Sequence, residues 1–185
     1  MDNGASSYRR FLDGDDNGIV EIIREYKDGV MLYLNGFVQN IHVAEDLTED
    51  TFLKLFVDRP YFAGRSTFKT WLYSIGRNVA LCYLRRNAKL PVVSTDETEP
   101  VLADEADVER NYLRTEQKFQ LHKALKGLKP EYRQVLYLIY FEGFRNDQVA
   151  IVMKKSKKQI ENLVYRAKLS LESELEKEGF LYEEL

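Results

Sequence analysis

The stretch FKTWLYSIGRNVALCYLRR at residues 68–86 decides the fold, because its apolar side chains recur at three- and four-residue spacing. The predicted buried stripe consists of Phe68, Leu72, Ile75, Val79 and Cys82. We expect Ser66 to cap the start of this helix and Asn87 to lie near its end. The same spacing recurs along nearly the whole chain, which has only 10 glycines and 4 prolines and no competing period-two pattern. The sequence therefore predicts an all-α fold.

No acidic residue occurs between positions 59 and 95, although the whole chain carries 30 acidic and 27 basic residues. Cations alternate with aromatic rings in this stretch. Cations attract phosphates and rings stack on bases, so the stretch is a candidate nucleic-acid-binding surface. We expect Lys69, Tyr73 and Arg77 to share an exposed face, because they follow one another at four-residue steps. The alternative is a solvated charged face with its rings in the core, but cations without anions repel one another unless a polyanion binds.

Upstream, one helical pattern opens at Ile19, is interrupted near Asp28-Gly29 and resumes at Met31. A second helix is predicted from Val43 to Val57. Its predicted buried face consists of Leu47, Thr51 and Leu55, beside Phe52 and Phe56. Its first turns carry the carboxylates Glu45, Asp46, Glu49 and Asp50. The helix dipole favours negative charge there, so the simple interpretation of these carboxylates is stability and solubility.

From Lys89 to about Arg114 the chain is rich in proline, serine, threonine and acid, without a long apolar period. We interpret this segment as a flexible acidic linker. A second interpretation, that its acids occupy a basic channel in place of nucleic acid, stays open. Beyond it, a helix is predicted from Pro130 to Glu142, with Gly143 as its stop.

The C-terminal part has the pattern of a helix-turn-helix. A short helix is predicted at 147–153, a tight turn at 154–156 and a longer helix at 157–175. In such a unit the second helix enters the major groove of duplex DNA. The candidate DNA-binding residues are Lys157, Lys158, Gln159, Asn162 and Arg166. A plain helical hairpin with a lysine-rich turn is the alternative.

Several classes of protein are disfavoured by composition. The single cysteine, Cys82, cannot form an internal disulfide, and His42 and His122 are too far apart to assemble a zinc site with it. There is no glycine-rich phosphate loop, no signal-peptide pattern and no long apolar run. We therefore expect a cytoplasmic protein without membrane insertion, metal or cofactor, and not an enzyme.

Taken together, the two halves resemble bacterial RNA polymerase sigma factors of the extracytoplasmic-function (ECF) group of the sigma-70 family. AEDLTEDTFLKLF at 44–56 and FKTWLYSIGRNVALCYLRR at 68–86 are similar to the family's second conserved region. ALKGLKPEYRQVLYLIYFEGF at 124–144, with the helix-turn-helix to Leu171, is similar to its fourth. The resemblance implies a region 2 domain at 1–90, a linker at 91–115 and a region 4 domain at 116–185.

The resemblance also implies partners and roles. Core RNA polymerase would bind Asp46, Leu47, Asp50, Phe52 and Leu53. The minus-ten element, melted into single strands, would bind Arg65, Lys69, Trp71, Tyr73, Arg77, Asn78, Arg85 and Arg86, with Trp71 and Tyr73 as ring contacts. A base turned out of the stack would enter a pocket of the 60–67 loop. Region 4 would bind the minus-thirty-five element as duplex, and an anti-sigma protein is implied by analogy alone.

The chain departs from the family in the turn of the helix-turn-helix, where Lys154 and Lys155 replace a glycine and an apolar residue. Glu161 and Leu163 stand where basic residues are common. An alternative function is a transcriptional regulator that binds operator DNA through this unit and dimerises through its N-terminal half. A third is a helical adaptor without a DNA role. The sequence leaves open whether the two halves pack together.

Overall fold

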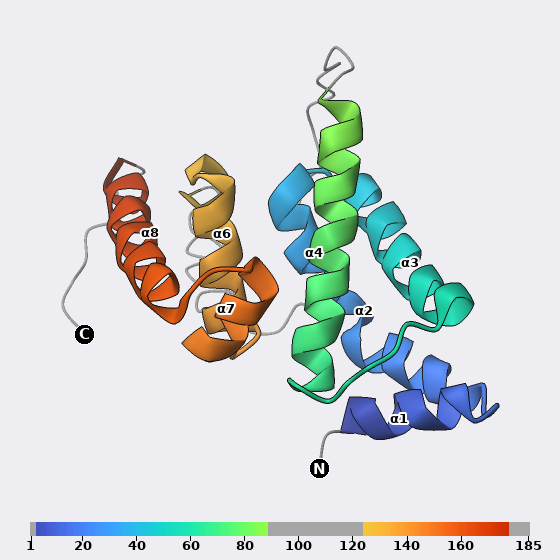
Figure 1. Cartoon of the computed structure of the whole chain (residues 1–185). Coiled ribbons are helices and arrows are strands. Elements are labelled where there is room, and N and C mark those ends of the chain that lie inside the picture. Colours follow the sequence, from blue (N-terminus) through green and yellow to red (C-terminus); the bar gives the residue numbers. More distant parts are fainter. Residues whose placement is uncertain (1–2, 89–123, 178–185) are drawn as a thin grey trace, which may run out of the picture.

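The computed structural model describes residues 3–88 and 124–177, and every regular element within these ranges is helical (Figure 1). The elements are α1 (Asn3–Leu12), α2 (Asn17–Val38), α3 (Ile41–Asp58), α4 (Phe68–Asn87), α6 (Pro130–Leu136), the π turn η1 (Tyr137–Phe141), α7 (Asn146–Met153) and α8 (Lys157–Lys177). The prediction of an all-α fold is confirmed. The whole of the predicted acidic linker, and with it the hypothesis that it fills a basic channel, lies outside the described residues.

Helix α2 is the centre of the N-terminal half, and α1, α3 and α4 pack around it. Leu34 of α2, Leu55 of α3 and Leu72 of α4 are wholly buried where these helices meet. Thr48 and Thr51 of α3 are also buried, and their hydroxyls donate to the backbone carbonyl four residues earlier at 2.6 and 2.7 Å. Because these hydroxyls are satisfied within their own helix, α3 can turn them toward the core at little cost.

Two features of the N-terminal half differ from the sequence predictions. Helix α2 continues through Asp28-Gly29, so the predicted interruption is wrong. Gly29 is instead a packing position, since a Cβ there would lie 2.4 Å from Tyr73 Oη. The short helix α1, which the sequence patterns did not indicate, is fixed by burial of Tyr8 and Phe11.

The start of α4 also differs from the prediction. Thr67, not Ser66, is the cap, because Thr67 Oγ1 accepts a hydrogen bond from Thr70 N at 3.2 Å. The Ser66 hydroxyl donates to the Thr67 carbonyl. The helix ends at Asn87 as predicted.

Asn40 caps the acidic helix α3, and its removal is expected to lower the free energy of unfolding. Asn40 Oδ1 accepts hydrogen bonds from His42 N at 3.1 Å and Val43 N at 3.2 Å. Asn40→Ala should therefore destabilise the chain by about 1 kcal/mol in urea unfolding. Asn40→Asp, which keeps the acceptor, should unfold close to the unaltered chain. Equal stability of all three would show that the cap contributes nothing.

In the C-terminal half, Pro130 begins α6 as predicted, but the helix is not regular as far as Glu142. Residues 137–141 form a single π turn, in which Glu142 N donates to the carbonyl five residues earlier at 3.1 Å. Such a turn adds one residue to the helix and rotates the side chains that come after it about the helix axis. Gly143 then ends the helix with φ +69°, as predicted.

Helices α7 and α8 and the turn between them form the predicted helix-turn-helix. Lys154 adopts the left-handed conformation in this turn, with φ +54°. That conformation disfavours side chains, which is the physical reason for a glycine at such a position. Ile160 and Ala167 of α8 are wholly buried.

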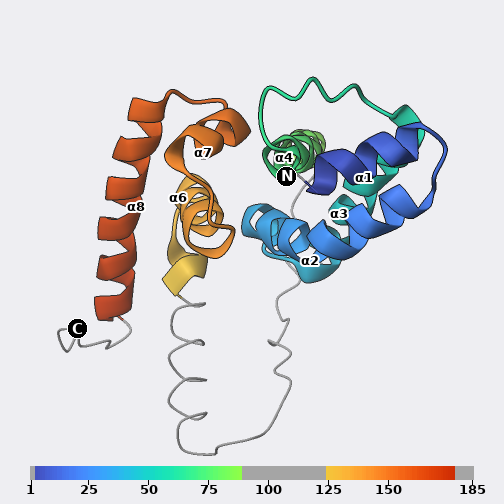
Figure 2. The ribbon, with the colours of Figure 1, turned by 90° about the horizontal axis from the view of Figure 1, so that it is seen from below.

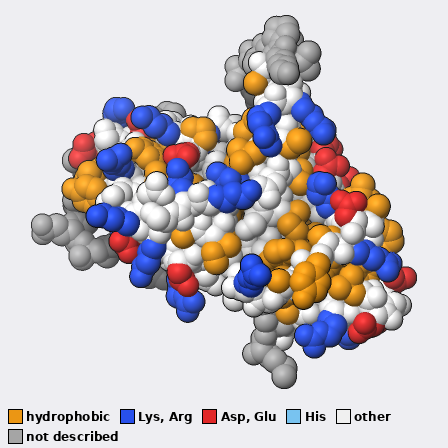
Figure 3. Space-filling view, in the orientation of Figure 1, with side chains coloured by type: hydrophobic (Ala, Val, Ile, Leu, Met, Phe, Trp, Pro, Cys, Tyr) orange, Lys and Arg blue, Asp and Glu red, His pale blue; other side chains and the backbone are white. Residues whose placement is uncertain are grey.

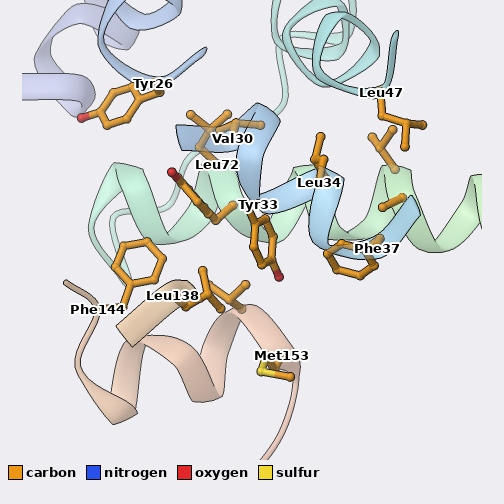
Figure 4. Close-up of a cluster of buried hydrophobic side chains, with 14 of the residues drawn as sticks. Tyr26, Val30, Tyr33, Leu34, Phe37, Leu47, Leu72, Leu138, Phe144 and Met153 are labelled. Atoms are coloured by element: carbon orange, nitrogen blue, oxygen red, sulfur yellow. The ribbon is translucent and has the colours of Figure 1, made fainter. Parts of the chain in front are cut away.

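The two halves pack against each other, which the sequence had left open (Figure 2). Helix α7 contacts α4, and α6 contacts α2. Leu138, Phe144 and Met153 of the C-terminal half are buried and belong to one apolar cluster with the side chains of α2 and α4 (Figure 4). At one edge of this contact region, Gln39 Nε2 donates to the Lys126 carbonyl at 3.0 Å. We refer to the contact region between the halves as the seam.

Candidate nucleic-acid interface

Three of the predicted DNA-binding cations are exposed and have no carboxylate partner among the described residues. Arg65 lies in the loop before α4, and Arg85 and Arg86 lie in its last turn, and all three are exposed. None of them forms an ion pair with a carboxylate of the described residues. Figure 3 shows Lys and Arg side chains over the upper end of α4 and over the C-terminal half. Cations without a carboxylate partner, on α4 and the loop before it, are available to a polyanion.

Trp71 belongs to a cluster of rings at the start of α4. Its ring centroid lies 5.3 Å from Tyr8, 5.1 Å from Phe62 and 5.5 Å from Phe68. Tyr8 Oη donates to the Pro60 carbonyl at 2.8 Å, which ties the loop to α1. Burial raises the pKa of Tyr8 to about 12, so this donor keeps its proton at neutral pH. The cluster holds the loop while Trp71 stays half-buried.

The loop at 59–67 presents an exposed ring beside this cluster. Tyr61 is 85% exposed, although sequence reasoning did not single it out. The loop is fixed at its start by the Arg59 guanidinium, 4.8 Å from the centroid of Phe11. Figure 3 shows apolar side chains gathered at the lower right, over this loop and α1. An exposed ring on an anchored loop can stack on an unpaired base.

The other predicted DNA contacts on α4 lie in the seam. Tyr73 is wholly buried, so the prediction that it shares an exposed face with Lys69 is wrong for this arrangement. Lys69 Nζ lies 2.8 Å from Glu142 Oε2 and donates to the Glu142 carbonyl at 3.0 Å. Asn78 Oδ1 accepts a hydrogen bond from Lys154 Nζ at 3.0 Å. The C-terminal half therefore covers part of the basic face of α4.

Tyr73 is held in the seam by both packing and hydrogen bonding. Its ring centroid lies 5.2 Å from Phe144, in an edge-on contact. Burial, and then the charge of Glu142 and a hydrogen bond to it, raise the pKa of Tyr73 far above that of an exposed phenol. The phenol therefore stays protonated and donates to the carboxylate.

The five predicted DNA-binding residues of α8 are exposed, and the structure brings three of them into one groove. Gln159, Asn162 and Arg166 line a groove of about 610 Å³ between α8 and the start of α6, together with Lys129 and Lys155. Lys157 and Lys158 begin α8 and are exposed as well.

Gln159 has a structural contact that limits its role as a base reader. Its Oε1 accepts from Ser156 N at 2.7 Å, while Ser156 Oγ accepts from Gln159 N at 3.2 Å. This is a capping box at the start of α8. The carbonyl end of the side chain is therefore engaged, and only its NH₂ group is available to a base edge.

The acidic helix α3 forms one side of a groove of about 700 Å³. Its floor is apolar and comes from Ile19, Ile23, Phe52, Leu53 and Phe56, with Asp46, Glu49 and Asp50 among the polar lining. Of the predicted polymerase-binding residues, Asp46, Asp50 and Leu53 are exposed. Leu47 and Phe52 are only 3% and 6% exposed, so they chiefly pack in the core. Phe56, 50% exposed, was assigned to the buried face by its spacing and belongs to this groove instead.

Other kinds of site are not found in the described part of the chain. No group of histidine, cysteine and carboxylate side chains at 3–88 or 124–177 could hold a metal ion. No helix in these ranges is long and apolar enough to cross a membrane.

Comparison with known families matches both halves in order. The model of Sigma-70 region 2 matches residues 22–90, and that of Sigma-70, region 4 matches residues 118–171. The chain belongs to the sigma-70 family. Relatives described as ECF RNA polymerase sigma factors, such as SigM of Bacillus subtilis, 25% identical over 155 residues, confirm the predicted resemblance to that group.

Further relatives cover nearly all of this sigma factor. RNA polymerase sigma factor YlaC of Bacillus subtilis is 27% identical over 162 residues, covering 87% of this chain and 94% of the relative. RNA polymerase sigma-H factor of Pseudomonas aeruginosa is 27% identical over 171 residues, covering 88% and 89%. The solved structure of the sigma factor RpoE from Bartonella quintana, in complex with the anti-sigma factor NepR, superposes with a TM-score of 0.67 at 22% identity, covering 84% of this chain and 95% of RpoE.

Within this sigma factor, the residues that sequence reasoning missed are those placed by long-range contacts. The ring of Tyr8 in α1 contacts that of Trp71 in α4, which is far along the sequence, and no local pattern in α1 indicates this contact. Glu142 lies at the end of a helix with no sequence signal linking it to Lys69. Tyr61 had a usable signal, because it is an aromatic residue beside Phe62 in the acid-free stretch.

Proposed function

We propose that this sigma factor binds core RNA polymerase through the α3 groove and directs it to promoters, where it helps to open the DNA. Region 2, at residues 1–90, would bind the melted minus-ten strand through α4 and the 59–67 loop. Region 4, at 116–185, would bind the minus-thirty-five element as duplex through α8, and residues 91–115 would link the two. The observation that carries the proposal is the ordered match of both sigma regions to the halves that bear these surfaces.

The energetics of strand opening support this use of α4. Melting costs roughly 1–2 kcal/mol per base step in lost stacking. Stacking of an unpaired base on an aromatic side chain returns about 1–3 kcal/mol per base. Tyr61 is exposed, Trp71 is partly buried, and Arg65 lies in the same loop as Tyr61. A single strand held there would meet both rings and a cation.

The chain makes and breaks no bond in this proposal. Its relatives are sigma factors, which are not enzymes, and the polymerase supplies the phosphodiester chemistry. We place its action in the cytoplasm, where polymerase and promoter DNA meet. An anti-sigma protein is a further proposed partner, because RpoE was solved with the anti-sigma factor NepR.

Run-off transcription with purified core polymerase on a library of genomic fragments tests this function. We expect specific transcripts only when the chain is added, and their start points would reveal the promoter. The control is core polymerase alone, and a second control adds the housekeeping sigma factor. Transcripts that appear only when another sigma factor is also present would favour the helix-turn-helix regulator. No effect of the chain under either condition would overturn both functions.

A further inference from the structure

Tyr61 stands between two anchors of the 59–67 loop. On one side of it, the Pro60 carbonyl accepts a hydrogen bond from Tyr8 Oη at 2.8 Å. On the other side, the ring of Phe62 packs against two rings of α4, at centroid distances of 5.1 and 5.7 Å. Tyr61 itself is 85% exposed. The backbone is therefore held on both sides of a ring that faces solvent.

Tyr8 takes part in both anchors. Its side chain is only 1% exposed, and its ring centroid lies 5.5 Å from that of Phe68 and 5.3 Å from that of Trp71. These are the two rings on which Phe62 packs. A buried hydroxyl is costly without a partner, and the acceptor of this one is a backbone carbonyl of the loop. The position of the loop is therefore coupled to α1.

The loop begins in a strained conformation, and α1 lies against it (Figure 1). Arg59 has φ +43°, in the left-handed region that disfavours side chains. Its guanidinium lies 4.8 Å from the ring centroid of Phe11, a second buried ring of α1. Attraction between a cation and a ring offsets part of the cost of this backbone conformation. Helix α1 thus supports the chain at two consecutive residues, Arg59 and Pro60.

Helix α1 is itself firmly attached. Ser7 Oγ donates to Glu21 Oε2 of α2 at 2.7 Å, and Arg10 pairs with the same carboxylate. Close approach to α4 depends on Gly4, because a Cβ there would lie 2.5 Å from Phe68 Cδ1, closer than real side chains come. The helix is therefore a fixed support for the loop.

This support lies outside the part of the chain that matches the family. The match to Sigma-70 region 2 begins at residue 22, whereas α1 spans Asn3–Leu12. The match therefore assigns α1 no role, and the contacts of Tyr8 and Phe11 are the observations that give it one.

We propose that Tyr8 is a positioning residue for strand capture: its hydroxyl holds the 59–67 loop so that Tyr61 stands outward as a preformed stacking surface for an unpaired base. The inference rests on the proposed function of α4 and this loop. A loop already held in its binding conformation loses less conformational freedom when the strand binds, so its affinity is higher. Tyr8 is buried and acts through the loop, without touching the DNA.

Two substitutions in the full-length chain remove this support in different ways. Tyr8→Phe keeps the ring and its packing but removes the donor to Pro60. Gly4→Ala keeps every hydroxyl and displaces α1 from α4. The matched control is Tyr33→Phe, because Tyr33 is also 1% exposed and its hydroxyl has no hydrogen-bond partner among the described residues. Far-UV circular dichroism checks that each variant is folded, and if one test variant fails to fold, the other decides.

The readouts are the affinity for a single strand and the exposure of Trp71. Fluorescence anisotropy of a labelled, short mixed-sequence single strand gives the affinity of each variant bound to core polymerase, with core polymerase alone as the blank. Acrylamide quenching in the free chain follows Trp71, its single tryptophan.

We expect Tyr8→Phe to lower the affinity about fivefold, which is the size of effect that one lost hydrogen bond produces. Trp71 should become easier to quench, because a loosened loop holds Phe62 against it for less of the time. Gly4→Ala should change both readouts in the same direction, and Tyr33→Phe should change neither.

A double-mutant cycle with Tyr61→Ala separates positioning from a general loss of stability. If Tyr8 acts by holding Tyr61 in place, Tyr8→Phe should cost less than about twofold in affinity once Tyr61 is alanine. A loss of about fivefold in both backgrounds would mean that the two residues act independently, and would overturn the inference.

The outcomes also distinguish this inference from the proposed function. An unaltered affinity of folded Tyr8→Phe, in a chain that still drives run-off transcription, would overturn the positioning role and leave the function standing. An equal loss in Tyr33→Phe would overturn it too, since removal of any buried hydroxyl would then suffice. If the unaltered chain adds no single-strand affinity to core polymerase and yields no specific transcripts, the proposed function fails and the inference fails with it.

Discussion

Replacement of Leu53 by glutamate is expected to weaken binding to core RNA polymerase by about 30-fold or more. Leu53 is 56% exposed and lies on the apolar floor of the α3 groove beside Phe56. Truncation or charging of a central apolar anchor commonly costs an interface at least about 2 kcal/mol, and each 1.4 kcal/mol is a factor of ten. Because the side chain already faces solvent, folding should change little.

The measurement is the dissociation constant for core polymerase, by fluorescence anisotropy of the labelled chain. Ile151→Glu is the matched control, since Ile151 is a similarly exposed apolar residue, 48% exposed, on α7. Equal weakening by both variants would point to a general effect of added charge. Unchanged affinity of the Leu53 variant would remove the α3 groove from the polymerase interface.

The elements of the fold were largely predictable because they depend on local pattern. Apolar spacing placed α3, α4 and the helix-turn-helix close to their observed bounds. The scarcity of glycine and proline excluded most other fold classes. A local rule gave a wrong answer at Gly29, where glycine normally suggests a break. The helix continues there, because the missing side chain leaves room for Tyr73 and Glu142.

The candidate site was predictable only in part, because exposure is set by partners far along the chain. Four-residue spacing put Tyr73 on the same face as Lys69, and that geometry is correct. The sequence could not show that this face is covered, since Glu142 lies 73 positions after Lys69. Three- and four-residue apolar spacing does not reveal a π turn either. Such a turn adds one residue to the helix and so rotates the side chains that follow it. The exposed cations of α4 could be identified from the sequence, because the lack of acidic residues around them is visible in the composition of the stretch.

Neutralising Arg65, Arg85 and Arg86 together is expected to abolish open-complex formation at moderate salt. These cations are exposed and pair with no described carboxylate, so replacement by glutamine should leave the fold and the seam intact. Each contact with a single-stranded phosphate contributes about 0.7 to the slope of log K against log salt. Loss of three contacts should therefore reduce that slope by about 2. Affinity should fall at every promoter, because phosphate contacts carry no sequence information.

The two readouts are permanganate reactivity of unpaired thymines, with core polymerase present, and the salt dependence of binding to a single strand. The control variant neutralises Arg9, Arg24 and Lys177, which lie on α1, α2 and the end of α8, and so changes the net charge equally. If both triple variants lose activity together, net charge rather than position is responsible. If the α4 variant opens promoters as fast as the unaltered chain, α4 and its loop do not hold the melted strand. If only the α4 variant fails to open promoters, and the salt slope of its DNA binding falls by about 2, then the cations of the acid-free stretch bind the phosphates of the DNA backbone.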